Sequence, residues 1–179
     1  MTPKEKRERL FRHSRPRLRE FEFYDGDEYH KDIKLAWVAH KIKPFYGISS
    51  DIDQSEFARV ITSMDAEILM AEDENRQYKG VGPVGICVMY HNGWKVEPHS
   101  FYFPWATSRN ILRSSVAYLQ WARNSRKIGC VYLAVVPDGK SLYDHICSYG
   151  VLHYIGRLIN GDPRGDVFIY SVKGKKRKV

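Results

Sequence analysis

The spacing of apolar residues in the first third of the chain predicts one strand followed by two helices. The stretch REFEFYDG alternates phenylalanine with glutamate, as a strand with one buried face does. Apolar positions at helical spacing predict a helix over residues 27–43, which Pro44 ends, and a second helix over residues 51–64. Ser49 or Ser50 is placed to cap the second helix.

The middle of the chain predicts an antiparallel meander. Three strand-like stretches, residues 66–73, 82–92 and 95–103, follow one another with short connections. The connection HNGW between the second and third stretches contains Asn-Gly, the strongest short signal for a β-hairpin. Pro98 in the third stretch cannot donate a hydrogen bond to a neighbouring strand, which indicates a bulge or a sheet edge there.

The last third of the chain predicts a long amphipathic helix, a buried strand, a short helix and two final strands. Ile111, Val116 and Leu119 lie on one face of the long helix, as in a helix packed on a sheet. The run KIGCVYLAVVP is continuously apolar, which favours a strand buried on both faces. Gly150 is a suitable residue to close the short helix. The predicted ranges are 107–125 for the long helix, 127–137 for the buried strand, 139–150 for the short helix, and 151–159 and 166–173 for the final strands.

These elements run in the order β-α-α-β-β-β-α-β-α-β-β. A meander followed by strand-helix-strand units predicts an α+β protein, whose central sheet is mixed but mostly antiparallel and carries helices on both faces. The chain has 179 residues, of which 43% are hydrophobic, and this is enough to form one core. The pattern therefore predicts a single domain.

The positive charge of the chain is concentrated at its two ends. The net charge is +8, and residues 1–20 and 173–179 each contribute +5, so the body between them sums to −2. We therefore expect a basic arm over residues 1–19, a domain over residues 20–172 and a basic tail from residue 173 onward. Such segments are solvated, or they bind an anionic surface such as DNA or an acidic protein.

The tail also contains a short basic run that is a candidate contact for such a partner. The run KKRK resembles a nuclear-import signal as well, although short basic runs are common. Binding to DNA, binding to an acidic protein and simple solvation all remain open for this run. Its residues are Lys175, Lys176, Arg177 and Lys178.

Cysteine and histidine spacing disfavours two other kinds of site. The cysteines at positions 87, 130 and 147 form no C-x-x-C pair, so we expect buried reduced thiols rather than disulfides or a zinc site. The seven histidines lack the spacing of metal ligands, and no metal is expected. No apolar run approaches the roughly 18 residues of a membrane-spanning helix, so we expect no membrane association.

The order and spacing of the elements over residues 20–172 resemble the GNAT fold of acyl-CoA-dependent N-acyltransferases. The segment VVPDGKSLYDHICSYGV is similar to the strand-to-helix segment of that family, with Asp138 at the position of an Asn and Gly150-Val151 at that of a Gly-Phe pair. The C-terminal half also resembles small GNAT-like proteins of tailed phages, some of which are particle components.

The resemblance implies a place for acyl-CoA, and acetyl-CoA is the possible ligand. The family seats the pyrophosphate on backbone amides where the fourth strand turns into the third helix, with the motif Q/R-x-x-G-x-G/A. Here the equivalent stretch PWATSRN has no glycine, so the close backbone approach is lost. Simple helix capping beside a surface arginine is the alternative interpretation. The candidate binding residues are Thr107, Ser108, Arg109 and Asn110.

The resemblance also implies an acid and a base. The family often uses a tyrosine of the fourth helix to protonate the departing thiolate, and either Tyr143 or His145 stands near that position. Glu97 and His99 flank Pro98 and share one strand face, so they are the candidate base. The alternative is a packed tyrosine, a surface histidine and a solvent-facing strand edge.

Two functions of different class follow. The first is an enzyme that moves a short acyl group from acyl-CoA to an amine. The second is a GNAT-like binding module, such as a virion component or a possible homo-oligomer, whose basic ends contact DNA or acidic neighbours. The missing glycines and the two basic ends favour the second, with a location in the cytoplasm or in a virion. An open gap between the fourth and fifth strands would favour the enzyme, and Trp105 or Arg109 lying across that gap would count against it.

Overall fold

A computed structural model of the chain describes residues 1–21, 30–45, 47–75, 78–92, 95–124, 130–163 and 165–172. Its helices and strands follow the predicted order, with one additional helix at the start. The elements are α1 (Pro3–Leu10), β1 (Arg17–Glu20), α2 (Lys31–Ile42), α3 (Gln54–Ser63), β2 (Ala66–Asn75), β3 (Gly80–Asn92), β4 (Lys95–Tyr102), α4 (Ser108–Asn124), β5 (Cys130–Val135), α5 (Pro137–Cys147), β6 (Leu152–Asp162) and β7 (Gly165–Val172).

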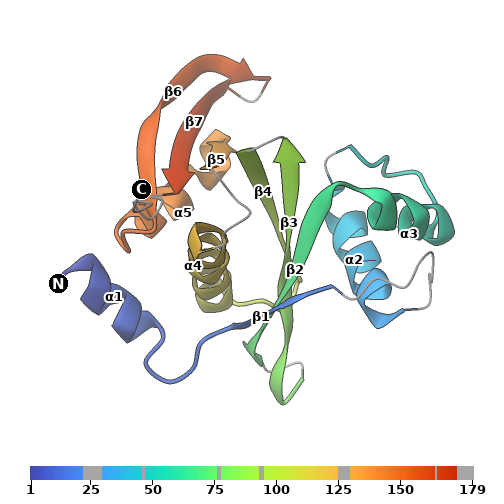
Figure 1. Cartoon of the computed structure of the whole chain (residues 1–179), viewed down its shortest axis with the longest axis horizontal. Coiled ribbons are helices and arrows are strands. Elements are labelled where there is room, and N and C mark those ends of the chain that lie inside the picture. The colour runs from blue at the N-terminus through green and yellow to red at the C-terminus, as the bar shows by residue number, and fades with distance from the viewer. Residues whose placement is uncertain are drawn as a thin grey trace, which may run out of the picture.

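The strands form one seven-stranded sheet in the order β1-β2-β3-β4-β5-β7-β6 (Figure 1). Neighbouring strands are antiparallel except β4 and β5, which are parallel. β2, β3 and β4 form the predicted meander, and their register is continuous apart from one shift in the β2–β3 ladder after Ala71. The sheet confirms the predicted mixed, mostly antiparallel architecture.

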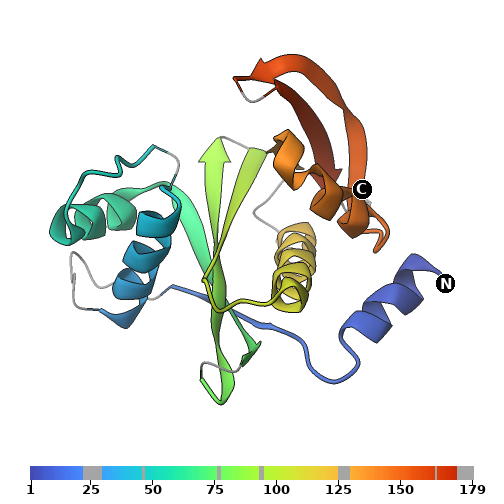
Figure 2. The same ribbon diagram turned by 180° about the vertical axis from the view of Figure 1, so that it is seen from behind.

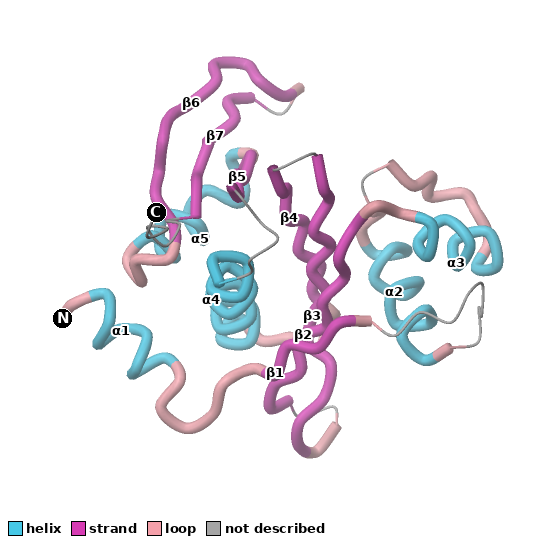
Figure 3. The backbone as a smooth tube through the Cα atoms, in the orientation of Figure 1, coloured by secondary structure: helices cyan, strands magenta, loops and turns pink. Residues whose placement is uncertain are grey.

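Helices cover both faces of the sheet, as predicted. α2 and α3 lie on one side of the strands and α4 on the other, which the tube view shows clearly (Figure 3). Each side has its own hydrophobic core. Phe57 and Ile33 anchor the α2/α3 side against Ile86 of β3.

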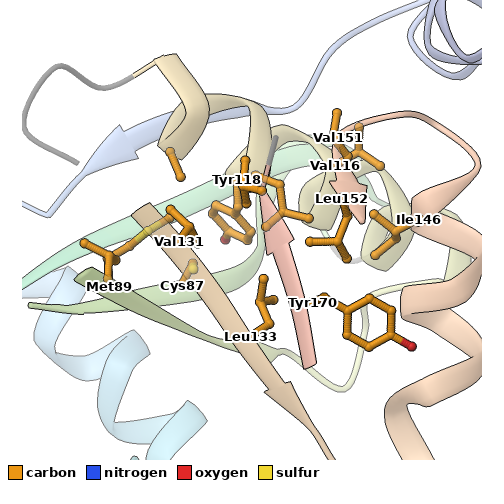
Figure 4. Close-up of a cluster of buried hydrophobic side chains, with 14 of the residues drawn as sticks. Cys87, Met89, Val116, Tyr118, Val131, Leu133, Ile146, Val151, Leu152 and Tyr170 are labelled. Carbon is orange, nitrogen blue, oxygen red and sulfur yellow. The ribbon is translucent and has the colours of Figure 1, made fainter. Parts of the chain in front are cut away.

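The core on the α4 side is the larger of the two. Val116 and Tyr118 of α4, Ile146 of α5 and Leu133 of β5 meet there, and Tyr170 of β7 closes it (Figure 4). The Tyr118 hydroxyl donates a hydrogen bond to the carbonyl of Gly85 on β3, at 2.9 Å, so its polar atom is satisfied inside the core. α4 is therefore fixed to the sheet by packing and by a buried hydrogen bond.

The N-terminal region differs from the prediction. β1 is RLRE, residues 17–20, so it overlaps the predicted strand REFEFYDG at Arg19 and Glu20, and the rest of that stretch from residue 22 lies outside the described residues. Backbone pairing with β2 sets this strand, although it has no strong apolar alternation of its own. α1 was not predicted at all. Thr2 and Glu5 form a capping box at its start, and Pro3 occupies the first turn.

α1 packs on the same side of the sheet as α4 and α5 (Figure 2). A Cβ on Gly150 would lie 2.9 Å from a side-chain carbon of Pro3, so the two meet closely. The Arg7 guanidinium donates to the carbonyl of Tyr149. Leu10 and Phe11 pack against the larger core. The segment expected to be a basic arm therefore contains an ordered helix in contact with the end of α5, whereas the tail from residue 173 lies outside the described residues.

Three local predictions can be compared with the structure. Gly150 has a φ of +68° and closes the turn after α5, which confirms its predicted role. α3 is capped by Asp53, whose carboxylate accepts from the amide of Glu56 at 2.8 Å, and not by the two serines. Pro98 pairs with Met89 of β3 without a register shift, so no bulge occurs there. In the described residues, no helix is long and apolar enough to cross a membrane.

Candidate active site

The strands β4 and β5 part soon after they meet. Their pairing in the described residues consists of Lys95 with Cys130 and Val96 with Val131. Beyond Val96, β4 stays with β3 and β5 pairs with β7, so a gap opens toward the carboxyl ends of the two parallel strands. Pro98 lies just past the branch point, where its missing N–H costs nothing because this side of β4 is an edge. This is the open gap that would favour the enzyme.

A cavity of about 390 Å³ lies in this gap. Its walls come from β4, from β5 and from the first turns of α5, and Lys43 at the end of α2 closes one side. A smaller pocket behind it shares Pro98, Ser100 and Tyr143 with the cavity and reaches the buried thiol of Cys87. The remaining lining residues of the cavity are Glu97, His99, Ala134, Val135, Val136, Asp138 and Gly139.

Side chains from both faces of the sheet reach this cavity. Alternation along β4 directs His99 toward the α2/α3 side, where its ring meets the edge of Tyr90 at 5.1 Å between ring centres. Further along the same strand, Tyr102 points to the other side and shares a 2.6 Å hydrogen bond with Ser115 of α4. Tyr143 also comes from that other side, on α5. The gap therefore joins two faces that a continuous sheet would keep apart.

Tyr143 is a suitable proton donor at this position. Its side chain is half-buried, and burial, with a smaller contribution from Cys87, raises its pKa to about 12. The phenol therefore keeps its proton at neutral pH. Its ring packs on that of Tyr170, at 5.8 Å between ring centres, and its hydroxyl has no hydrogen-bond partner among the described residues. That hydroxyl is free to bond to a ligand in the cavity.

Glu97 and His99 form a pair at the other wall. His99 Nε2 lies 3.1 Å from Glu97 Oε1. The carboxylate side chain is 57% exposed and the imidazole 29%, so both are accessible from the cavity and from solvent. A carboxylate in contact with one ring nitrogen fixes the orientation of the imidazole, and such a pair can accept a proton. Structure and sequence agree that the two residues share one face.

His145 lies away from the gap. It is two residues from Tyr143 on α5, so a helix turns the two side chains to different sides. His145 lines a second cavity, of about 340 Å³, between α1, α4 and α5. Arg109 lines that second cavity too. Of the two candidate acids, only Tyr143 contacts the gap.

The start of α4 is capped from within the protein. The Thr107 amide and hydroxyl both donate to Oδ1 of Asn110, at 3.0 and 2.8 Å, and the Asn110 amide donates to Thr107 Oγ1 at 3.2 Å. The Asn110 side-chain amide continues to the carboxylate of Asp73, at 3.1 Å. Ser108 and Arg109 are exposed, and their backbone amides have no partner among the described residues. Two of the four candidate binding residues are thus engaged in capping and two face solvent.

Neither residue that could block the gap does so. The Trp105 indole donates to the carbonyl of Pro83 at 2.7 Å, and its ring stacks on Phe103 with 4.8 Å between ring centres. That contact belongs to the α2/α3 side. Arg109 points to the second cavity instead. The turn before α4 is therefore filled by its own capping network, but the gap itself is open.

Several lining residues were not singled out from the sequence. Ser100 could have been found, because strand alternation places it with Pro98 on the α4/α5 side of the gap. Lys6 and Arg9 of the second cavity carry no local signal of a site. In the part of the chain that the structure describes, no three His, Cys, Asp or Glu side chains are arranged to hold a metal ion. The basic run at 175–178 lies outside those residues.

Comparison with known proteins identifies the fold. No protein-family model and no curated protein matches the chain. The spermidine/spermine N-acetyltransferase SpeG from Vibrio cholerae, solved with manganese ions, superposes with a TM-score of 0.65 at 14% identity, over 88% of this chain and 92% of that one. Mutant forms of the same enzyme give the same TM-score and identity over 88% and 94%. A chimera of SpeG with hSSAT gives 0.65 at 14% over 89% and 96%. This chain therefore has the GNAT N-acetyltransferase fold.

Proposed function

We propose that the protein is an acyl-CoA-dependent N-acetyltransferase that acts on an amine. The observation that carries the proposal is the gap between β4 and β5, where Tyr143 on one face and the Glu97–His99 pair on the other line one cavity. An acyl transfer to an amine needs a proton acceptor near the attacking nitrogen and a proton donor near the leaving sulfur. The named structural neighbours, which are spermidine N-acetyltransferases, support the same function.

The gap suits the narrow arm of acyl-CoA. Past Val96, the β5-facing edge of β4 has no strand partner in the described residues, so its backbone groups are available to the amides of a pantetheine chain. The small side chain of Ser100 leaves space there, and Ser108 and Arg109 offer free amides at the start of α4. When bound, acetyl-CoA supplies an activated thioester carbonyl.

The residues of the cavity then divide the proton transfers. His99 Nε2 donates its hydrogen to the Glu97 carboxylate, and the Glu97–His99 pair oriented in this way accepts the proton that the attacking amine loses as the new C–N bond forms. Tyr143 Oη donates a proton to the sulfur that leaves as the C–S bond breaks. The raised pKa of Tyr143 keeps that proton in place until the sulfur becomes basic.

The acidic groups at the cavity favour a cationic acceptor. Glu97 and Asp138 line it with Lys43 as the one lysine or arginine in the described lining. A second amino group on the acceptor would be attracted to the two carboxylates. The structural neighbours are named spermidine/spermine N-acetyltransferases, so polyamines are the first acceptors to test.

The test is acetyl transfer in solution, with CoA release measured by chromatography over a panel of primary amines. Tyr143→Phe is expected to lower kcat by about 10²-fold to 10⁴-fold, the range of a general acid. Tyr154→Phe is the matched control, because Tyr154 is 51% exposed on β6. The activity of this variant should equal that of the wild type. Absence of both acetyl-CoA binding and CoA release would refute the proposal, as would full activity of Tyr143→Phe.

The alternative function, a non-catalytic binding module such as a virion component, has less support. The solved structures named above are enzymes, and the gap is not blocked by Trp105 or Arg109. The outcome that would favour this alternative is an intact, folded protein that binds DNA or an acidic protein and has no affinity for acetyl-CoA.

A further inference from the structure

The second cavity, between α1, α4 and α5, has the composition of an anion site. Three cationic side chains line it, those of Lys6, Arg9 and Arg109, together with His145. No carboxylate is among its described lining residues, which also include Met1, Leu10, Ser148 and Tyr149. A concave surface that carries positive charges and no negative ones attracts anions more strongly than a flat surface with the same charges, because the low-dielectric walls focus the field.

The charges of these three side chains are not balanced by close ion pairs in the part of the chain that the structure describes. Within the described residues, none of Lys6, Arg9 and Arg109 has an ion-pair partner. The acidic residues of α1 are engaged elsewhere, since Glu5 accepts from the amide of Thr2 and Glu8 pairs with Lys4 at 3.8 Å. Unpaired like charges repel one another, so an anion in the cavity would relieve that repulsion.

Uncharged donors are available at the same place. Arg109, whose side chain lines the cavity, and the neighbouring Ser108 are exposed residues of the first turn of α4, where the helix dipole favours negative charge. The hydroxyl oxygen of Ser148, at the end of α5, is buried and has no hydrogen-bond partner in the described residues. These groups are the kind that phosphate oxygens accept from.

α1 is held in place by contacts that do not involve its free cations. Pro3 packs on Gly150, Arg7 donates to the Tyr149 carbonyl, and Leu10 packs on the larger core. Lys6 and Arg9 are therefore presented by a docked helix. Their substitution should leave the docking contacts intact.

The cavity lies in line with the gap. On α5, Tyr143 lines the gap and Ser148 lines the cavity. On α4, Ser115 borders the pocket behind the gap and Arg109 lines the cavity, about 9 Å apart along the helix axis. A ligand with its reactive end in the gap and its anionic end beyond the start of α4 would reach both places.

We infer that α1 completes a binding site for the phosphate groups of the CoA nucleotide. Lys6 and Arg9 supply positive charge at this site. That charge takes the place of the close backbone approach to phosphate that the glycine-free turn before α4 does not allow. The inference rests on the proposed function, and it assigns to the N-terminal helix a part in recognising acyl-CoA. The phosphates require cations and donors, and the cavity provides both.

The experiment uses the full chain and isothermal titration with two probes, acetyl-CoA and adenosine 3′,5′-bisphosphate. The double variant Lys6→Gln/Arg9→Gln should bind both probes about tenfold more weakly or worse, since two charge-assisted contacts are lost. The control Lys4→Gln/Arg12→Gln makes the same change in net charge at exposed positions outside the cavity lining, and it should stay within about twofold of the wild type. Circular dichroism checks that each variant is folded.

The outcomes separate this inference from the proposed function. If the wild type transfers acetyl groups and Lys6→Gln/Arg9→Gln binds both probes as tightly as the wild type does, the inference is overturned and the proposed function stands. Binding of the bisphosphate that depends on Lys6 and Arg9, with neither acetyl-CoA binding nor acetyl transfer, would support the phosphate site and refute the function. Equal weakening by the control pair would also overturn the inference, because it would show a general charge effect.

Discussion

A buried ion pair holds the first turns of α4 to the sheet. Arg113 of α4 and Asp73 of β2 are each 2% exposed, and their charged atoms lie 3.3 Å apart. The guanidinium also donates to Ser14, and the carboxylate accepts from Asn110 and from the amide of Glu74 at 2.8 Å. The pair therefore joins α4, β2 and the segment that leads to β1.

Removing one partner should be costly, because it leaves the other charge buried. Breaking a buried pair typically costs about 3–5 kcal/mol of unfolding free energy. For Arg113→Met we expect the lower end, about 3 kcal/mol, since Asp73 keeps two hydrogen bonds and the removed guanidinium has one buried, unpartnered nitrogen, Nε. In a domain of this size, about 3 kcal/mol lowers Tm by roughly 6–12 °C.

The assay is urea unfolding followed by circular dichroism, for Arg113→Met, Asp73→Asn and the double variant. The double variant should cost about as much as either single one, a coupling near 3 kcal/mol, because it removes both charges together. The control is Arg157→Met, whose pair with Asp166 has the same 3.3 Å separation but a 52% exposed arginine, and which should cost about 0–1 kcal/mol. Single effects that add within about 0.5 kcal/mol would refute this reasoning.

Three further outcomes can be measured. Gly85→Ala places a Cβ 2.6 Å from the Tyr102 ring and 2.8 Å from a β4 carbonyl, so it should lower the free energy of unfolding in urea by about 1–3 kcal/mol. Gly156→Ala is the control, because a Cβ there has nothing within 4 Å and should cause no such loss. Equal losses in the two variants would contradict this prediction. Burial lowers the pKa of His40, so the folded state disfavours the proton that the unfolded state accepts below pH 6.5. The free energy of unfolding should therefore fall as pH drops from 7.5 to 5.5, and His40→Gln should reduce that fall. An identical fall in the variant would exclude His40 as its source. Burial raises the pKa of Cys87 to about 12, so iodoacetamide at pH 8 should alkylate it only in urea, as peptide mass spectrometry would show; labelling of the native protein would contradict the buried position.

Apolar periodicity predicted most of the fold because the meander strands and the last two strands pair with their neighbours in sequence. The meander and α4 carry strong periodic signals, and both were predicted within a few residues. α1 was missed because the N-terminal residues were interpreted from their positive charge alone. Thr2, Pro3 and Glu5 form a helix start that the sequence itself indicates. β1 was placed only in part, since its pairing is set by partners in β2 that lie about fifty residues or more away in sequence.

The candidate site was predicted in its residue types but not in its grouping. Strand alternation correctly placed Glu97 and His99 on one face, but only the tertiary fold shows that this face meets α5 across a gap. The choice between Tyr143 and His145 was open to helical reasoning, because Tyr143 shares a face with the fully buried Ile146 three residues on. Lys6 and Arg9 line one cavity with residues at the end of α5, which lie most of the chain away in sequence, so no local pattern could reveal this grouping.

The short junction between β4 and β5 has a consequence for how this protein can change during evolution. Two residue pairs join the strands in the described part of the chain, while β3–β4 and β5–β7 carry their own ladders. A change that widens the junction breaks few backbone hydrogen bonds in either ladder. The width of the gap can therefore change while both ladders stay intact, so the size of the ligand that the gap admits can vary more readily than the architecture.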